Sequence, residues 1–142
     1  MKKMGKKIIL VIDDSFANLQ LCRGLLRGEY DVRLAKSGEM ALNVLANVKP
    51  DIILLDIMMP DMSGFEFIRE IGEDAELRAI PVIFVTAHVT GEYLSDAASC
   101  GAANYVVKPF AADVLRAKIQ NALNNRRADS NNTIFSPQYI NP

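Results

Sequence analysis

Four short apolar runs in this chain each end at a residue that can carry a charge or form a hydrogen bond. Runs of this length, rich in valine and isoleucine, predict strands buried on both faces, as in a parallel sheet covered by helices. The carboxyl ends of parallel strands meet at one edge of such a sheet, where ligands bind. The runs, each with the residues that follow it, are 8–12 with Asp13 and Asp14, 52–55 with Asp56, 82–85 with Thr86, and 105–107 with Lys108.

Segments with helical spacing of apolar residues lie between these runs, and a further short strand is predicted over 32–35. Alternating strands and helices with right-handed crossovers predict a five-stranded, doubly wound α/β fold. Ser15 and Ser37 are the predicted caps of the first two helices. The helix over 91–100 is short of large apolar residues. The residues predicted to face inward from the other helices are Leu19, Cys22, Leu25 and Leu26; Met40, Ala41, Val44, Leu45 and Val48; Phe65, Ile68 and Ile71; and Leu115, Ile119 and Ala122.

Charge and cysteine content limit the classes of protein to consider. The chain carries 16 basic and 17 acidic residues, and no basic stripe indicates a nucleic-acid partner. The lysines near the start precede an apolar run, over 8–12, that is too short for a signal or membrane segment. Cys22 and Cys100 lack metal-ligand spacing, which favours reduced thiols in a cytoplasmic protein. We expect one domain over 1–127 and a polar tail or linker over 128–142.

Three carboxylates, those of Asp13, Asp14 and Asp56, are predicted to converge at the carboxyl edge of the sheet. If the strands that precede them are neighbours, the strand ends lie about 5 Å apart. Without a cation the carboxylates would repel one another, and their pKa values would rise. Mg²⁺ prefers oxygen ligands and removes this repulsion. With the Thr86 hydroxyl and the Lys108 ammonium on the same edge, the sequence predicts a site for a metal ion and a phosphoryl group.

This set of residues resembles the receiver domains of bacterial two-component response regulators, the chemotaxis type included, over about residues 6–125. The loop 56–64 is similar to the stretch that follows the phosphorylated aspartate in that family. The resemblance implies a (βα)5 flavodoxin-like fold with strand order 2-1-3-4-5. It also implies that Asp56 attacks a phosphoryl group carried on a histidine and becomes an acyl phosphate.

The same resemblance implies a role for each metal ligand. Asp14 and Asp56 would bind Mg²⁺ directly, Asp13 would act through water, and the backbone carbonyl of Met58 would add another ligand. The Met58 thioether is too soft to be a ligand itself. Lys108 would face the phosphoryl oxygens from the other side, because this transfer needs charge neutralisation more than acid–base chemistry.

Further positions take their expected roles from the family. The Thr86 hydroxyl would bind a phosphoryl oxygen, and Tyr105 would turn inward as Thr86 moves, so that the two form a switch. The peptide bond between Lys108 and Pro109 would be cis. Gly64 would serve the backbone, because glycine tolerates positive φ. His88 is interpreted as a loop residue with a modest influence on dephosphorylation.

The implied partners are a sensor histidine kinase or phosphotransfer protein, and a downstream effector or fused output domain. A partner or a second copy of the chain would dock on the fourth helix, fifth strand and fifth helix. Met58, Met59 and Met62 are interpreted either as local packing around Pro60 or as a flexible contact for the kinase. Such a chain is no enzyme beyond assisting its own phosphoryl transfer and dephosphorylation.

Three other interpretations fit the sequence less well. An aspartyl phosphatase needs an acid two residues after the nucleophile, where this chain has Met58. A flavin-binding protein of the same topology needs a phosphate loop rich in hydroxyls and glycine after the first strand, where this chain has Asp13 and Asp14. A degenerate receiver that acts as a constitutive protein–protein contact is disfavoured by the intact residue set. Whether the chain is free-standing or part of a longer protein stays open.

Overall fold

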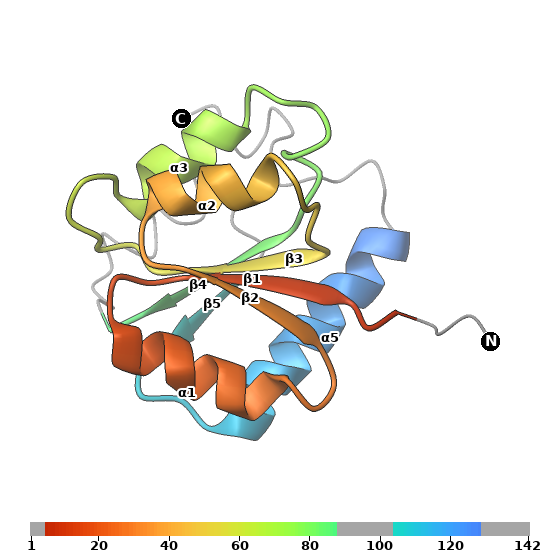
Figure 1. Cartoon of the computed structure of the whole chain (residues 1–142). Helices are drawn as coiled ribbons and strands as arrows, with labels where there is room; N and C mark the ends of the chain where they lie inside the picture. The colour runs from red at the N-terminus through yellow and green to blue at the C-terminus, as the bar shows by residue number, and fades with distance from the viewer. Residues whose placement is uncertain (1–4, 88–103, 129–142) are drawn as a thin grey trace.

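A computed structural model describes residues 5–87 and 104–128 as a twisted parallel sheet with helices on both faces (Figure 1). The strand order is β2-β1-β3-β4-β5, and every pairing is parallel. The doubly wound fold and the order 2-1-3-4-5 are therefore confirmed. The strands are β1 (Ile8–Ile12), β2 (Asp31–Ala35), β3 (Ile52–Leu55), β4 (Val82–Thr86) and β5 (Asn104–Val107).

The pairing register brings the ends of the three central strands and β5 to one edge of the sheet. Ile12 of β1 pairs with Leu55 of β3, so Asp13 and Asp56 follow neighbouring strand ends. Thr86 pairs with Val107, the residue before Lys108, at the end of β5. The four runs identified in the sequence therefore end side by side.

Four helices are described, and serine side chains cap the first three. The helices are α1 (Phe16–Leu26), α2 (Gly38–Leu45), α3 (Gly64–Ile71) and α5 (Ala112–Ala128). Ser15 and Ser37 cap α1 and α2 as predicted, because each side chain accepts an N–H three residues later. Ser63 caps α3, and the Glu66 carboxylate accepts the Ser63 N–H in return. This capping box satisfies two backbone donors at the end of the loop that begins at Asp56.

The core has two layers, one on each face of the sheet (Figure 1). The helices α1 and α5 cover one face, and α2 and α3 cover the other. Burial of apolar side chains in both layers is the main stabilising contribution to this fold. The first layer takes Leu19, Cys22, Leu26, Leu115, Ile119 and Ala122 from its helices; the second takes Ala41, Phe67, Ile68 and Ile71.

One prediction of helix facing was wrong, and one buried residue was not predicted. Met40 was predicted to face the core, but 44% of it is exposed, because α2 turns Ala41 toward the sheet instead. Phe67 was not predicted to be inward and is fully buried, whereas Phe65 is only partly buried and packs edge-to-face on Phe84. Because α2 and α3 are short, a single exposed apolar residue can change which face of the helix the sequence pattern predicts to be buried.

Some expectations fall outside the described residues. They are the helix over 91–100, the interpretation of His88, the thiol of Cys100 and the tail beyond Ala128. Among the helices of 5–87 and 104–128, none is long and apolar enough to cross a membrane. The division into a domain over 1–127 and a tail over 128–142 stays a prediction.

Candidate functional site

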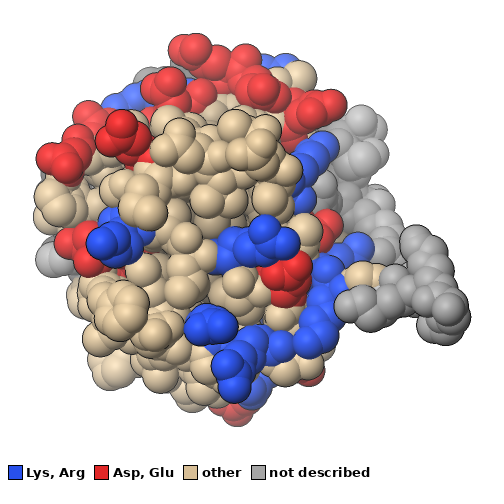
Figure 2. Space-filling model, viewed as in Figure 1, with Lys and Arg blue, Asp and Glu red and all other residues tan. Residues whose placement is uncertain are grey.

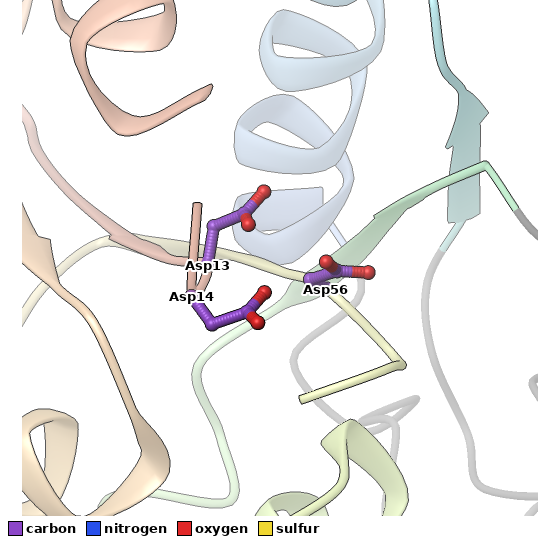
Figure 3. Close-up of side chains that lie close together, drawn as sticks. All are labelled: Asp13, Asp14 and Asp56. Carbon is purple, nitrogen blue, oxygen red and sulfur yellow. The ribbon is translucent and has the colours of Figure 1, made fainter. Parts of the chain in front are cut away.

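The three carboxylates lie together at the carboxyl edge of the sheet (Figure 3). Asp13 and Asp14 follow β1, Asp56 follows β3, and one oxygen from each lies within 4.8 Å of the others. Asp13 and Asp56 are buried, with 4% and 7% exposed, whereas Asp14 is exposed. Oxygen donors at this spacing fit a hard divalent cation such as Mg²⁺, which would enter from the exposed side.

Lys108 reaches into this cluster from the end of β5. Its Nζ lies 2.8 Å from Asp13 Oδ2 and 3.4 Å from Asp56 Oδ2. The Lys108 backbone N–H donates to the Thr86 carbonyl oxygen at 2.9 Å, which fixes the start of the β5–α5 connection. The peptide bond from Lys108 to Pro109 is cis. The cluster therefore contains a cation of its own beside the three carboxylates.

Burial controls the electrostatics of this site. It raises the pKa of the Asp56 carboxyl, an effect that the Lys108 charge opposes and the Asp13 charge reinforces. Burial would also lower the pKa of the Lys108 ammonium, but its bond to Asp13 and the charges of both carboxylates outweigh this and raise it. The expected direction for Asp56 is confirmed, but repulsion contributes less than removal from water.

Asp13 and Asp14 differ in how their oxygens are used. Asp13 Oδ1 accepts the Ser15 N–H at 2.9 Å, and Asp13 Oδ2 accepts from Lys108. Both oxygens of Asp13 thus accept short bonds inside the protein, whereas the contacts of the two Asp56 oxygens are longer, at 3.3 and 3.4 Å, and Asp14 faces solvent. This contrast suits Asp14 as a direct ligand and Asp13 as one that acts through water.

The loop after Asp56 folds back over its carboxylate. The Met58 N–H donates to Asp56 Oδ1 at 3.3 Å, and the Met58 side chain is 44% exposed. The bond favours the ionised form and so lowers the pKa of Asp56, against the effect of burial. The loop therefore places the Met58 backbone beside the predicted metal position.

Gly64 is needed for a different reason from the one expected. Its φ is not in the left-handed region, so tolerance of positive φ does not explain it. A Cβ at this position would lie 2.7 Å from the Asp56 carbonyl oxygen and 3.0 Å from the Cα of Ile57. The Gly64 N–H donates to the Ile57 carbonyl at 2.8 Å. The start of α3 therefore packs directly behind the Asp56 backbone, which only glycine permits.

Thr86 and Tyr105 lie on the same face of the sheet. Tyr105 pairs in register with Phe84, and Thr86 follows Phe84 by two residues on β4. Thr86 is 1% exposed, whereas Tyr105 is 39% exposed. In one state of the predicted switch the Tyr105 ring is turned inward. The structure does not show that state, because Tyr105 is exposed.

Comparisons with known proteins agree with this geometry. A model of the response regulator receiver domain family matches residues 9–120. The chemotaxis protein CheY of Pseudomonas aeruginosa is 36% identical over 114 residues, covering 79% of this chain and 92% of that protein. The structure of chemotaxis protein CheY4 of Vibrio cholerae superposes with a TM-score of 0.79 at 28% identity, covering 83% of this chain and 99% of that one.

Longer proteins contain similar segments. A probable cyclic di-GMP phosphodiesterase of Vibrio cholerae is 36% identical over 128 residues, which cover 90% of this chain. The matched chain spans only 29% of that relative's length. The activity in that relative's name therefore belongs to the whole of a longer protein.

Proposed function

The chain belongs to the response regulator receiver domain family of two-component systems, and on this premise we propose that Asp56 accepts a phosphoryl group from a sensor histidine kinase or phosphotransfer protein. In this reaction an Asp56 oxygen attacks phosphorus as the nitrogen–phosphorus bond of a phosphohistidine breaks. The product is an aspartyl acyl phosphate, and the released imidazole nitrogen takes a proton from solvent.

The residues around Asp56 suit such a transfer. Burial keeps bulk water away from the carboxylate, while the Met58 N–H holds one oxygen in place. The Lys108 ammonium, 3.4 Å from Asp56, is positioned to neutralise charge on the incoming phosphoryl oxygens. Mg²⁺ held by Asp14, Asp56 and the Met58 carbonyl would supply further neutralisation of those oxygens. The buried Thr86 hydroxyl would bind a phosphoryl oxygen after transfer.

The observation that carries this proposal is the convergence of Lys108 with Asp13 and Asp56 from three different strand ends. A receiver that only formed constitutive contacts would not need a partly buried ammonium between two buried carboxylates, since such groups are costly to bury. The phosphoacceptor function is therefore favoured over a degenerate receiver. The protein would assist its own phosphoryl transfer and dephosphorylation and catalyse no other reaction.

The experiment is incubation with acetyl phosphate, followed by intact-mass analysis. With Mg²⁺ we expect one phosphoryl adduct, and with a chelator in place of Mg²⁺ we expect almost none. Asp56→Asn should abolish the adduct, whereas Asp51→Asn, at the opposite end of β3, should leave it unchanged. No adduct in the wild-type protein with Mg²⁺ would contradict the proposal.

The output would pass through the face formed by β5 and α5. Large apolar side chains are exposed there on both elements, at Tyr105, Val107 and Val114, and with Lys118 they line a groove of about 470 Å³. An effector, a fused output domain or a second copy of the chain would dock on this face. The fourth helix, which is expected to contribute to the same face, lies outside the described residues.

A further inference from the structure

A second groove lies between the start of α2 and the loop that joins β3 to α3. Its volume is about 610 Å³, and Asp14 lines it at the carboxylate cluster. The apolar lining comes from Met40, Leu42, Met59, Pro60 and Met62. We call this feature the methionine groove. Most of its lining residues belong to α2 and to the loop between β3 and α3, and none is shared with the groove along β5 and α5.

The methionines occupy different depths in the methionine groove. Met59 is buried, Met62 is partly buried, and Met40 is 44% exposed. The Met62 side chain lies over Gly38, where an added Cβ would come within 2.5 Å of its sulfur. This contact joins the loop to the first residue of α2. The result is an apolar floor of flexible, polarizable side chains, which adapt to apolar groups of different shapes.

The rim of the methionine groove is acidic. Asp14, Glu39 and Asp61 line it against one basic residue, Lys36. Figure 2 shows the wider setting: acidic side chains gather over the α2 and α3 side of the molecule, and basic ones gather toward the α1 side. The negative electrostatic potential of these acidic side chains favours the approach of a positively charged partner.

We propose that the methionine groove binds a basic amphipathic helix of a protein partner. One face of such a helix presents apolar side chains at positions i, i+3 and i+4, which suit a groove with a methionine floor. Flanking lysine or arginine side chains would meet Glu39 and Asp61, and Asp14 would stay available to the metal ion. Because Asp14 belongs to both the groove and the carboxylate cluster, the bound helix would lie beside the phosphoacceptor site. This binding requires no phosphoryl group on Asp56.

The test uses the full chain labelled with ¹³C at the methionine methyl groups. The probe is a synthetic helix of about 18 residues composed of leucine and lysine, and its matched control carries glutamate in place of lysine. We expect the leucine–lysine helix to shift the signals of Met40, Met59 and Met62 in a saturable manner. The leucine–glutamate helix should leave them unchanged. Equal effects of the two helices, or shifts confined to methionines outside the groove, would overturn the proposal.

Substitutions separate groove binding from general attraction between charges. Met40→Glu adds a charge to the floor and should weaken binding at least about tenfold. Leu21→Glu places the same charge at a similarly exposed apolar position on α1, outside both grooves, and should leave the affinity unchanged. The double variant Glu39→Gln with Asp61→Asn should weaken binding and reduce its dependence on salt. Unchanged affinity in Met40→Glu, in a protein whose amide spectrum shows an intact sheet, would contradict the proposal.

Discussion

The ammonium nitrogen of Lys108 lies 3.4 Å from Asp56 Oδ2 at the edge of the sheet, although 52 residues separate the two in sequence. The same nitrogen lies 2.8 Å from Asp13 Oδ2. The carboxylate cluster is therefore partly neutralised before a metal ion binds. In this account Lys108 shifts from stabilising the resting carboxylates to neutralising the phosphoryl group.

The first prediction separates the two neighbouring aspartates. Asp14→Ala should weaken Mg²⁺ binding by about tenfold or more, because Asp14 is exposed and proposed to be a direct ligand. Asp13→Ala should weaken it less, because both Asp13 oxygens already accept bonds inside the protein. Metal titration of the two variants measures the difference. Equal losses would show that the two roles cannot be separated in this way.

The same pair of variants should show the reverse order in stability. Asp13→Ala removes the acceptor for Ser15 and leaves Lys108 without its closer carboxylate, so we expect a loss of roughly 1–3 kcal/mol. Asp14→Ala should change the free energy of unfolding little, because Asp14 is exposed. Urea denaturation in chelator makes the comparison.

The second prediction concerns pH. Burial raises the pKa of Asp56 in the folded protein, so between its unfolded and folded values the native state holds more protons, and stability falls as pH rises through that window. Because an asparagine side chain does not ionise, Asp56→Asn should not lose stability in this pH window. In chelator it should raise the free energy of unfolding by roughly 0.5–2 kcal/mol at neutral pH, and the gain should vanish below about pH 4.

Saturating Mg²⁺ is the control for the pH prediction. The metal stabilises the protein that binds it, so Mg²⁺ should raise the free energy of unfolding more in the wild type than in Asp56→Asn. The stability difference between the two proteins should therefore become smaller or change sign. A variant that is less stable than wild type at neutral pH in chelator would show that burial does not dominate at Asp56.

The third prediction tests the packing behind Asp56. Gly64→Ala should destabilise the protein by roughly 1–3 kcal/mol, because the added Cβ would press on the Asp56 carbonyl oxygen. It should also slow phosphorylation by acetyl phosphate. Gly24→Ala is the matched control: nothing lies within 4 Å of its added Cβ, and in α1 it should stabilise the protein by up to about 1 kcal/mol. Similar changes in stability and in phosphorylation rate in the two variants would show that the packing at Gly64 is not required.

The fourth prediction concerns the switch. Beryllofluoride, which mimics an acyl phosphate, should alter chemical shifts across 89–107 more than across 32–48, and should reduce the exposure of Tyr105. Thr86→Ala should weaken the response at Tyr105, because the buried hydroxyl is proposed to couple the site to β5. If the largest chemical-shift changes appeared over 40–48, the proposed switch of Thr86 and Tyr105 would be wrong.

The strand ends could be predicted because each is marked twice, by a continuous apolar run and by the polar residue that stops it. Parallel pairing then brings Asp13, Asp56, Thr86 and Lys108 to one edge without any further information. The caps at Ser15 and Ser37 are equally local signals. Ser63 with Glu66 carries the same kind of signal, a capping box, which the sequence analysis missed.

The remaining features depend on contacts between distant segments. The ion pair of Lys108 with Asp13 requires side-chain positions that no local pattern contains. Gly64 was expected to be needed because glycine tolerates positive φ, but glycine is needed there because α3 approaches the Asp56 backbone closely. Met40 was assigned to the core on periodicity alone, whereas the fold leaves it on the methionine groove.

The most direct test of the account identifies the residue that carries the phosphoryl group. After incubation with acetyl phosphate and Mg²⁺, borohydride reduces an aspartyl phosphate to homoserine, which peptide mass spectrometry locates. We expect homoserine at position 56 in the wild-type protein and none at any position in Asp56→Asn. Homoserine at position 13 or 14, or its persistence in Asp56→Asn, would contradict the assignment of Asp56 as the phosphoacceptor.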